Sequence, residues 1–368
     1  MPSSESLDLS VSLLRVTDNL GYPIPYTENI HRGLRENNIR SKIVQFVPRN
    51  FTSSEFCGPD YITIREGLSR MDYRLMLGLF LPKYKITDTS VIHLMEPNLF
   101  SLVKPSKNMV VTIHDLYFLS TDEKRLDKKI FSLYNKHMYN LSKKSKFIIT
   151  DSDFSKSDII KKLNLNPMKV IKIYPIINIS LFKPGNSTFR KKYKIKDSEI
   201  ILLNVSGPGK RKNFNFLLRA ISKLPRNYRL IHIGKLGEES ELLMHQLKIT
   251  DRLINFNRVS SLALSDIYRA SDIYVHPSFF EGFGMPIAEA MASGCFVMGA
   301  NCASIPEVIG DTGTLFDPYD LDYFVEILLN YGRNEEFYMN KREQGRARSL
   351  RFSIDSIMPR LIDVYRKI

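Results

Sequence analysis

Short runs rich in apolar and β-branched residues alternate with stretches of helical periodicity along most of the chain. The runs predict strands at 42–47, 91–94, 109–114, 146–150 and 169–174, and then at 200–205, 229–233, 253–256, 273–275, 296–298 and 314–316. Between them, apolar positions at helical spacing predict helices over 126–141, 214–224 and 286–294. Such alternation is typical of parallel sheets with crossover helices, so we expect an α/β fold.

A chain of 368 residues is too long for one ordinary hydrophobic core and suits two domains. The best linker is the polar segment 183–187, which reads Lys-Pro-Gly-Asn-Ser and has no apolar period. We therefore expect one Rossmann-like domain over 1–183 and a second over 184–351. Two such domains with parallel sheets would place their strand ends, and hence their ligands, in the cleft between them.

The composition, 43% hydrophobic and 25% charged, is that of a globular protein. Cys57, Cys295 and Cys302 show no paired spacing, which favours a reducing compartment over a disulfide framework. The first ten residues are polar and do not resemble a signal peptide. The longest apolar run, 75–82, is far shorter than the roughly 20 residues that a spanning helix requires. We therefore expect a cytoplasmic protein.

The formal net charge of +14 raises the question of an anionic partner. Residues 1–184 carry 27 Lys and Arg against 18 Asp and Glu, and residues 185–368 carry 26 against 21. Much of the first excess lies between Lys124 and Lys172, and within it Lys143, Lys144 and Lys146 stand close together after the helix 126–141. This cluster can be the solvated face of a core helix, which we favour, or a peripheral contact with anionic membrane lipids. No nucleic-acid motif accompanies the charge, so we expect no nucleic-acid partner.

The segment 277–294 carries the strongest chemical signal, because a strand, a glycine-bearing loop and a helix follow one another there. Pro286 suits the first turn of a helix, and Gly294 suits the position just after its end. A helix N-terminus with glycines beside it favours an anion such as a diphosphate. Glu281 and Glu289 flank the turn, and their carboxylates could accept hydrogen bonds from sugar hydroxyls.

A second strand–loop–helix unit lies at 200–213, with Gly207 and Gly209 in the loop and three consecutive cations, Lys210, Arg211 and Lys212. Glycines, a helix start and cations together form an anion site. Taken alone, this loop is an equally good solvated turn. The presence of the Glu281 segment in the same chain favours the anion site.

The run from Glu281 to Glu289, with Gly282-Phe283-Gly284-Met285-Pro286 between them, resembles the E-x7-E motif of the retaining GT-B glycosyltransferases of family 4. Arg211-Lys212-Asn213 resembles the phosphate-binding Arg-Lys of that family, and Thr112-Ile113-His114-Asp115 resembles its N-terminal strand end. The resemblance covers nearly the whole chain, most strongly 200–317. It implies the GT-B fold, with the closing helix 352–368 packed back on the first domain.

The resemblance also implies a role for each matching residue. Arg211 and Lys212 would neutralise the diphosphate of a nucleotide-sugar donor, with Gly207 in the same loop. Backbone amides near Phe283, Gly284 and Met285 would hold phosphate and sugar. Glu281 would contact the sugar hydroxyls, Glu289 the ribose hydroxyls, and His114 would lie near the sugar across the cleft. The resemblance implies no metal or other cofactor, and we identify no Asp-x-Asp pair of the kind that holds a divalent ion to a diphosphate.

Some of these residues also have plain structural explanations. His114 could be a strand-end histidine bonded to Asp115, and Glu289 could offset a helix dipole. The segment from Asn19 to Tyr26 has one glycine where the family has a glycine-rich loop, which leaves the acceptor contacts open.

The pattern is most similar to mannosyltransferases, so we expect transfer of mannose from GDP-mannose to a glycan or lipid-linked acceptor. Glucose or N-acetylglucosamine from a UDP-sugar is the alternative donor group. Two other functions stay open: a sugar-nucleotide epimerase of the same architecture, and a nucleotide-sugar-binding protein with impaired turnover.

Overall fold

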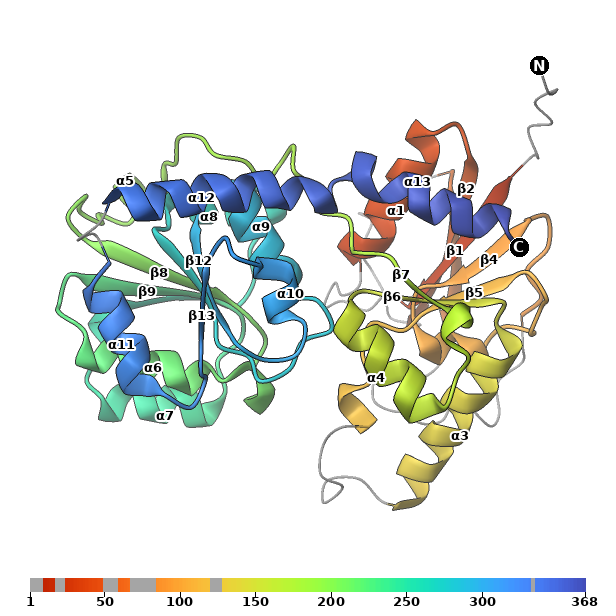
Figure 1. The fold of residues 1–368 in the computed structure, drawn as a ribbon, viewed down its shortest axis with the longest axis horizontal. Coiled ribbons are helices and arrows are strands. Elements are labelled where there is room, and N and C mark those ends of the chain that lie inside the picture. The colour runs from red at the N-terminus through yellow and green to blue at the C-terminus, as the bar shows by residue number, and fades with distance from the viewer. Residues whose placement is uncertain (1–8, 17–23, 49–58, 67–83, 120–127, 332–334) are drawn as a thin grey trace. The chain divides into compact units, whose positions relative to one another are not determined.

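The computed structural model describes residues 9–16, 24–48, 59–66, 84–119, 128–331 and 335–368 (Figure 1). It divides into two compact units, which we call the N-terminal unit (Met1–Ile176 with Ile354–Ile368) and the C-terminal unit (Ile177–Ser353). We expected the division at 183/184, beside the polar linker. The chain enters the C-terminal unit earlier because the Ile177 backbone N–H donates to the Phe352 carbonyl oxygen at 2.8 Å.

The N-terminal unit is built on a seven-stranded sheet in the order β3-β2-β1-β4-β5-β6-β7, and every strand pair is parallel. Its strands are β1 Ser10–Val16, β2 Arg40–Pro48, β3 Tyr61–Glu66, β4 Val91–Leu94, β5 Met109–Thr112, β6 Phe147–Thr150 and β7 Val170–Lys172. The helices are α1 Ile24–Glu36, α3 Lys128–Lys144, α4 Asp153–Leu163 and α13 Ile354–Arg366, with short 3₁₀ turns at Pro97–Ser101, Tyr117–Leu119 and Pro167–Lys169.

The C-terminal unit has a six-stranded parallel sheet in the order β10-β9-β8-β11-β12-β13. Its strands are β8 Ile200–Val205, β9 Tyr228–Ile233, β10 Leu253–Phe256, β11 Ile273–His276, β12 Phe296–Ala300 and β13 Thr314–Phe316. The helices are α5 Phe189–Lys192, α6 Phe214–Lys223, α7 Glu238–Gln246, α8 Ser261–Ala270, α9 Met285–Ser293, α10 Ile305–Ile309, α11 Leu321–Leu329 and α12 Glu335–Ser349, with 3₁₀ turns at Lys210–Lys212, Thr250–Arg252 and Leu350–Phe352.

The predicted α/β class with parallel sheets is confirmed, and all eleven predicted strands have counterparts. The prediction missed β1 and β3. Strand β1 lies centrally in its sheet but carries two polar residues, Ser12 and Arg15, whose side chains are fully buried. Burial is possible because Arg15 Nη1 pairs with Glu28 at 2.6 Å and Nη2 donates to Gln45 at 3.0 Å. A strand with partnered polar residues inside does not show the apolar run by which buried strands are found.

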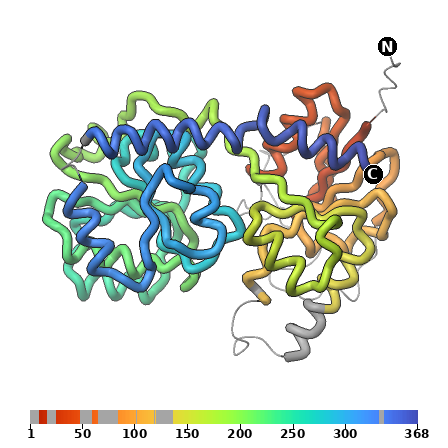
Figure 2. The backbone as a smooth tube through the Cα atoms, in the orientation of Figure 1, coloured from red at the N-terminus to blue at the C-terminus, as the bar shows by residue number. Residues whose placement is uncertain are grey.

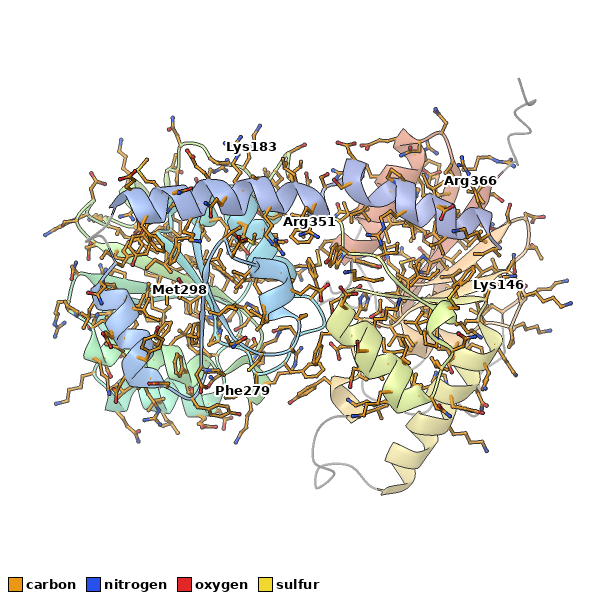
Figure 3. The ribbon with its side chains drawn as sticks, viewed as in Figure 1. Lys146, Lys183, Phe279, Met298, Arg351 and Arg366 are labelled. Atoms are coloured by element: carbon orange, nitrogen blue, oxygen red, sulfur yellow. The ribbon has the colours of Figure 1, made fainter. Side chains whose placement is uncertain are left out.

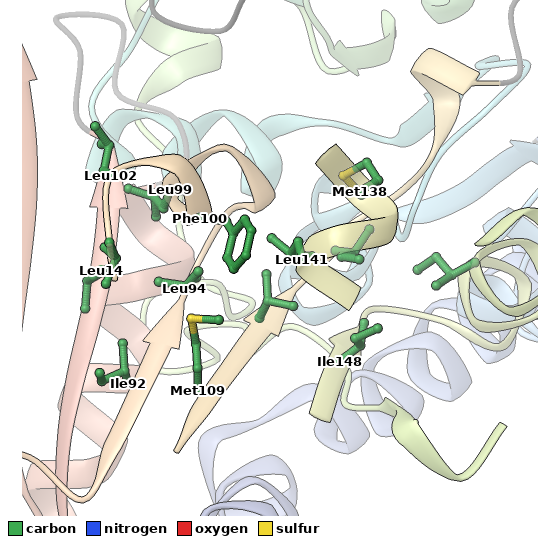
Figure 4. Packing of buried hydrophobic residues seen from close by; sticks show 14 of the residues in the cluster. Leu14, Ile92, Leu94, Leu99, Phe100, Leu102, Met109, Met138, Leu141 and Ile148 are labelled. Carbon is green, nitrogen blue, oxygen red and sulfur yellow. The ribbon is translucent and has the colours of Figure 1, made fainter. Parts of the chain in front are cut away.

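Each sheet has its own apolar core. Figure 4 shows part of the N-terminal core, where Leu94 and Met109 from the sheet face Phe100 and Leu141 from the covering segments. In the C-terminal unit, Phe216, Phe316 and Phe324 form a buried aromatic cluster, with Phe216 stacked on Phe316 at 5.6 Å between ring centroids. Two separate cores hold two rigid sheets, and each sheet carries loops at its carboxyl edge.

The closing helix α13 packs on α1 of the N-terminal unit, and the backbone tube in Figure 2 shows the two segments, blue and red, side by side. The contact is close because α1 has Gly33 there: a Cβ at this position would lie 2.5 Å from the Met358 side chain. On the inner face of α13, Tyr365 is 1% exposed. The end of the chain is therefore part of the core of the first unit.

Candidate donor-sugar site

The loop from β11 to α9 has the shape that its sequence predicts. Helix α9 starts at Met285 with Pro286 in its first turn and ends before Gly294, which adopts a left-handed conformation with φ 86°. Gly284 precedes the helix with φ 93°, and a Cβ there would lie 2.9 Å from Ile287 Cδ1. Only glycine adopts this conformation without strain, so the backbone of the loop is fixed by sequence.

Glu281 is the centre of this loop's chemistry, since two cations converge on its carboxylate. Lys212 Nζ lies 2.6 Å from Oε1, and Arg211 Nη1 lies 3.2 Å from Oε2. Arg211 also donates to the Phe280 carbonyl oxygen at 2.9 Å. The Phe279 backbone N–H donates to the Arg211 carbonyl at 2.8 Å and joins the two loops; Figure 3 labels Phe279 at the edge of the unit. The three charged residues that the sequence picked from distant segments thus come together.

The surroundings keep Glu281 ionised. Its side chain is only 9% exposed, and burial alone would raise the pKa of the carboxyl. Lys212, His276 and Arg211 more than offset burial and hold the pKa well below its usual range. Ser304 fixes the backbone beside it by donating to the carbonyl oxygens of Glu281 and Phe283 at 2.9 and 3.2 Å.

His276 is part of this site and was not predicted. Its Nε2 lies 3.0 Å from Glu281 Oε1, and its Nδ1 lies 2.8 Å from the Tyr274 hydroxyl. Burial lowers its pKa although Glu281 raises it, so the ring is neutral and bridges two polar groups. A signal was available: His276 is the last residue of a buried strand, at the carboxyl edge where ligands bind in open α/β sheets.

Glu289 lies on α9, and its carboxylate is not among the groups that contact Lys212 or Arg211. Oε2 accepts from the Tyr268 hydroxyl at 3.0 Å. Burial raises the pKa of Glu289 to about 7, although the bond from Tyr268 lowers it. Two carboxyls at opposite ends of one motif therefore differ in charge state, because only Glu281 has cations beside it.

The loop after β8 borders a pocket of about 380 Å³ that is lined by Gly207, Gly209, Lys210, Asn213 and the β9–α7 connection, including Lys235 and Gly237. A Cβ on Gly207 would meet no atom within 4 Å, so the space above this glycine is open to a ligand. Lys210 is mostly exposed and pairs with Glu239 at 3.6 Å. Arg211, Lys212 and Glu281 do not line the pocket.

His114 belongs to the N-terminal unit and follows β5. The structural alternative, a bond from His114 to Asp115, is wrong. Asp115 Oδ1 accepts from the Tyr117 backbone N–H at 2.9 Å. The His114 Nδ1 instead lies 2.7 Å from Asp151 Oδ2, at the end of the neighbouring strand. The sequence signal for Asp151 was its position directly after β6.

The sequence does contain two Asp-x-Asp triplets, at 151–153 and 320–322. In the structure their carboxylates have other partners: Asp151 pairs with His114, Asp153 with Lys172, and Asp322 with Lys223, while Asp320 caps α11. Over the described ranges, no three His, Cys, Asp or Glu side chains are grouped as a metal site requires. In the same ranges, no helix is both long and apolar enough to cross a membrane.

Known proteins share both the sequence and the architecture. We call the loop between β8 and α6 and the loop between β11 and α9 the donor loops. Both lie within residues 186–348, which match the family described as Glycosyl transferases group 1. The O-antigen chain mannosyltransferase B of Escherichia coli is 29% identical over 282 residues, which is 73% of each chain. The chain is a glycosyltransferase of the GT-B fold and resembles mannosyltransferases.

Other relatives support the same assignment with different coverage. The serotype-specific mannosyltransferase WbdA of Escherichia coli is 26% identical over 264 residues; these cover 66% of this glycosyltransferase but only 31% of WbdA. Among solved structures, the sucrose-phosphate synthase of Thermosynechococcus elongatus matches with a TM-score of 0.79 at 18% identity and covers 98% of both chains. At that identity the structural match shows the fold alone.

Proposed function

We propose that this glycosyltransferase moves mannose from GDP-mannose to a glycan or lipid-linked glycan, with retention of anomeric configuration and without a metal ion. The observation that carries the proposal is the buried Glu281 carboxylate held by Lys212 and Arg211 beside the N-terminus of α9. The mannosyltransferases among its relatives support the choice of sugar. Glucose or N-acetylglucosamine from a UDP-sugar is the alternative.

The two cations account for departure of the nucleotide. As the glycosidic bond breaks, negative charge develops on the diphosphate and positive charge on the sugar ring. Lys212 and Arg211 are fixed in position by Glu281 before substrate arrives, so they need little reorganisation to stabilise the leaving group. The backbone N–H groups at the start of α9 would add a favourable interaction with the same anion.

Glu281 and Glu289 divide the rest of the donor between them. The ionised Glu281 accepts hydrogen bonds from the sugar hydroxyls and favours a cationic ring in the transition state. Glu289, about one turn into α9, receives the ribose hydroxyls. The open pocket beside Gly207, at about 380 Å³, is within the usual range for a small-molecule site and would take the base of the nucleotide.

The acceptor side belongs to the N-terminal unit in this proposal. Lys143, Lys144 and Lys146 are all exposed, and Lys146 extends outward from the unit in Figure 3. Three exposed lysines within four positions would attract an anionic lipid surface. A lipid-linked acceptor would then be held close to the enzyme by a reversible electrostatic contact.

The stereochemistry tests the proposal without knowledge of the acceptor. The enzyme is incubated with GDP-mannose in water, and the first mannose released by slow hydrolysis is observed by proton NMR before its anomers equilibrate. We expect the α anomer, which is the configuration of the donor. Release of the β anomer would contradict retention. Release of a sugar from UDP-sugars but not from GDP-mannose would show that the donor is a UDP-sugar.

The two competing functions give different results. An epimerase would change the sugar of the nucleotide sugar without any acceptor. A binding protein with impaired turnover would bind the donor and leave it intact.

A further inference from the structure

The carboxyl edge of the N-terminal sheet brings together His114 and Asp151. Strands β5 and β6 are neighbours in register, with Thr112 opposite Ile149, so the residues that follow them meet at the edge. Asp151 is 4% exposed, and its Oδ2 lies 2.7 Å from His114 Nδ1. Among the residues that the structure describes, neither Asp151 Oδ1 nor His114 Nε2 has a hydrogen-bond partner, although both atoms are buried.

The imidazole is held on a second side by a chain of buried polar groups. The Tyr26 ring meets the His114 ring edge to face, with centroids 4.9 Å apart and planes at 84°. The Tyr26 hydroxyl lies 3.4 Å from the Thr112 hydroxyl, which lies 2.7 Å from His93 Nε2. The chain ends on α13, where the Tyr365 hydroxyl lies 2.6 Å from His93 Nδ1. Strands and both helices thus fix the ring plane of His114.

The charges around the two histidines differ. Burial lowers the pKa of His114, but Asp151, Glu96 and Asp115 more than offset it and raise it to about 9. Burial lowers the pKa of His93 to about 3, and the positive charge on His114 adds to that effect. Only His114 has a carboxylate as a direct partner, so it alone carries a proton on both nitrogens at neutral pH.

We propose that Asp151 is the positioning residue of His114: by accepting the Nδ1 proton it fixes the ring so that Nε2 offers its N–H to an oxygen of the transferred sugar. The inference rests on the proposed function and on the expectation, implied by the resemblance to family 4, that His114 lies near the transferred sugar. Asp151 itself touches no substrate. Asp151 fixes the charge of the His114 ring and the direction in which its Nε2–H points.

The first test needs no substrate. The chain has seven histidines, and His114→Gln assigns the His114 signal by its disappearance from a proton–carbon NMR spectrum recorded across pH. In the unmodified protein we expect His114 to stay protonated past pH 8, since its pKa is about 9. In Asp151→Asn the midpoint of the His114 titration should fall by about one pH unit or more, because the negative charge that most stabilises the protonated imidazole is lost. A His114 midpoint at or below that of free histidine in the unmodified protein would overturn the inference, whether or not the variant folds.

The second test measures turnover. Asp151→Asn should lower kcat by about 10–100-fold, as loss of a partner that orients a functional histidine commonly does. The affinity for GDP should not change. The control is Asp153→Asn, which removes a carboxylate two residues away that is 65% exposed and pairs with Lys172; kcat and the His114 titration should stay as they are.

The outcomes separate the two levels of the argument. If His114→Gln turns over normally, the proposed role of His114 is wrong. If His114→Gln is impaired while Asp151→Asn keeps both kcat and the His114 midpoint, the inference about Asp151 is wrong and the proposed function stands. If no nucleotide sugar is turned over at all, the proposed function fails, and the NMR titration still decides whether Asp151 controls His114.

Discussion

The sheets of the two units share one strand order over six strands, with β7 added in the N-terminal unit, and differ in the chemistry at their carboxyl edges. In the C-terminal unit, cations and glycines surround one ionised carboxylate beside an open pocket. In the N-terminal unit, a buried carboxylate holds one histidine, and a chain of buried polar groups that ends on Tyr365 lies beside its ring. The difference follows from what each edge is proposed to bind. A diphosphate requires fixed positive charge, whereas neutral hydroxyls require oriented donors and acceptors.

The origin of order also differs between the edges. The donor loops are fixed locally, by Pro286 and by the left-handed Gly284 and Gly294. His114 is fixed through groups distant in sequence, as far as Tyr365 on the closing helix. Substitutions in the donor loops should therefore act on binding or turnover, while those in the N-terminal network act through a second residue.

The largest effect is expected at Glu281. Glu281→Ala should lower kcat by about 10²–10³-fold, the usual consequence of losing one preorganised electrostatic contact to a transition state. Its effect on nucleotide affinity should be smaller. Glu289→Ala should do the reverse and weaken nucleotide binding by roughly 1–3 kcal/mol, since the ribose hydroxyls lose their hydrogen-bond partner and stay unpaired in the complex. Turnover and GDP affinity are measured on both variants. Equal effects of the two changes on both quantities would show that the roles are misassigned.

The next largest effect is expected on membrane binding, which the proposal assigns to the N-terminal unit. Lys143, Lys144 and Lys146 changed together to alanine should weaken binding to anionic vesicles by about 3 kcal/mol, because each basic residue near such a surface contributes about 1 kcal/mol. Co-sedimentation with neutral and acidic vesicles checks this at two salt concentrations, since about 1 M salt screens most of the attraction. Negligible pelleting of the unmodified protein in all four conditions would leave the lysines as a solvated face and favour a soluble acceptor.

Lys212→Ala should weaken GDP binding by roughly 1.5–3 kcal/mol, because a charge-assisted hydrogen bond to phosphate is lost. The matched control is Lys223→Ala on α6, whose lysine is exposed and pairs with Asp322 outside the donor loops. Calorimetry compares the two. The same small loss of GDP affinity in both variants would mean that Lys212 neutralises the charge of Glu281 and does not bind the phosphate.

The two loop glycines sharpen the comparison within the donor site. Gly284→Ala should reduce the free energy of unfolding by about 1–2 kcal/mol, because its φ of 93° strains any L side chain. Gly207→Ala should leave that free energy within about 0.5 kcal/mol and still weaken GDP binding, since its Cβ enters only open space. Denaturant unfolding and calorimetry check both. Unchanged GDP affinity in Gly207→Ala would exclude the space above this glycine from the nucleotide site.

The same contrast explains what could be predicted from the sequence. Glu281, Lys212 and the turn around Gly284 were predicted because glycines, a proline and charges stand close together in sequence and report local geometry. The ion pairs between Glu281 and the two cations were not foreseen, and neither were His276 and Asp151, since strand register brings these residues together. Strand β1 was missed because Arg15 is buried with partners from α1 and β2, which no local pattern shows.

A calorimetric titration with GDP, in parallel with and without EDTA, tests the central claim most directly. That claim is that the loops carrying Lys212 and Glu281 bind a nucleotide-sugar donor without metal. We predict micromolar affinity that is the same in EDTA, because Lys212 and Arg211 supply the charge that a divalent ion would otherwise provide. Binding that vanishes in EDTA, or no binding of GDP or UDP at any accessible concentration, would contradict the account.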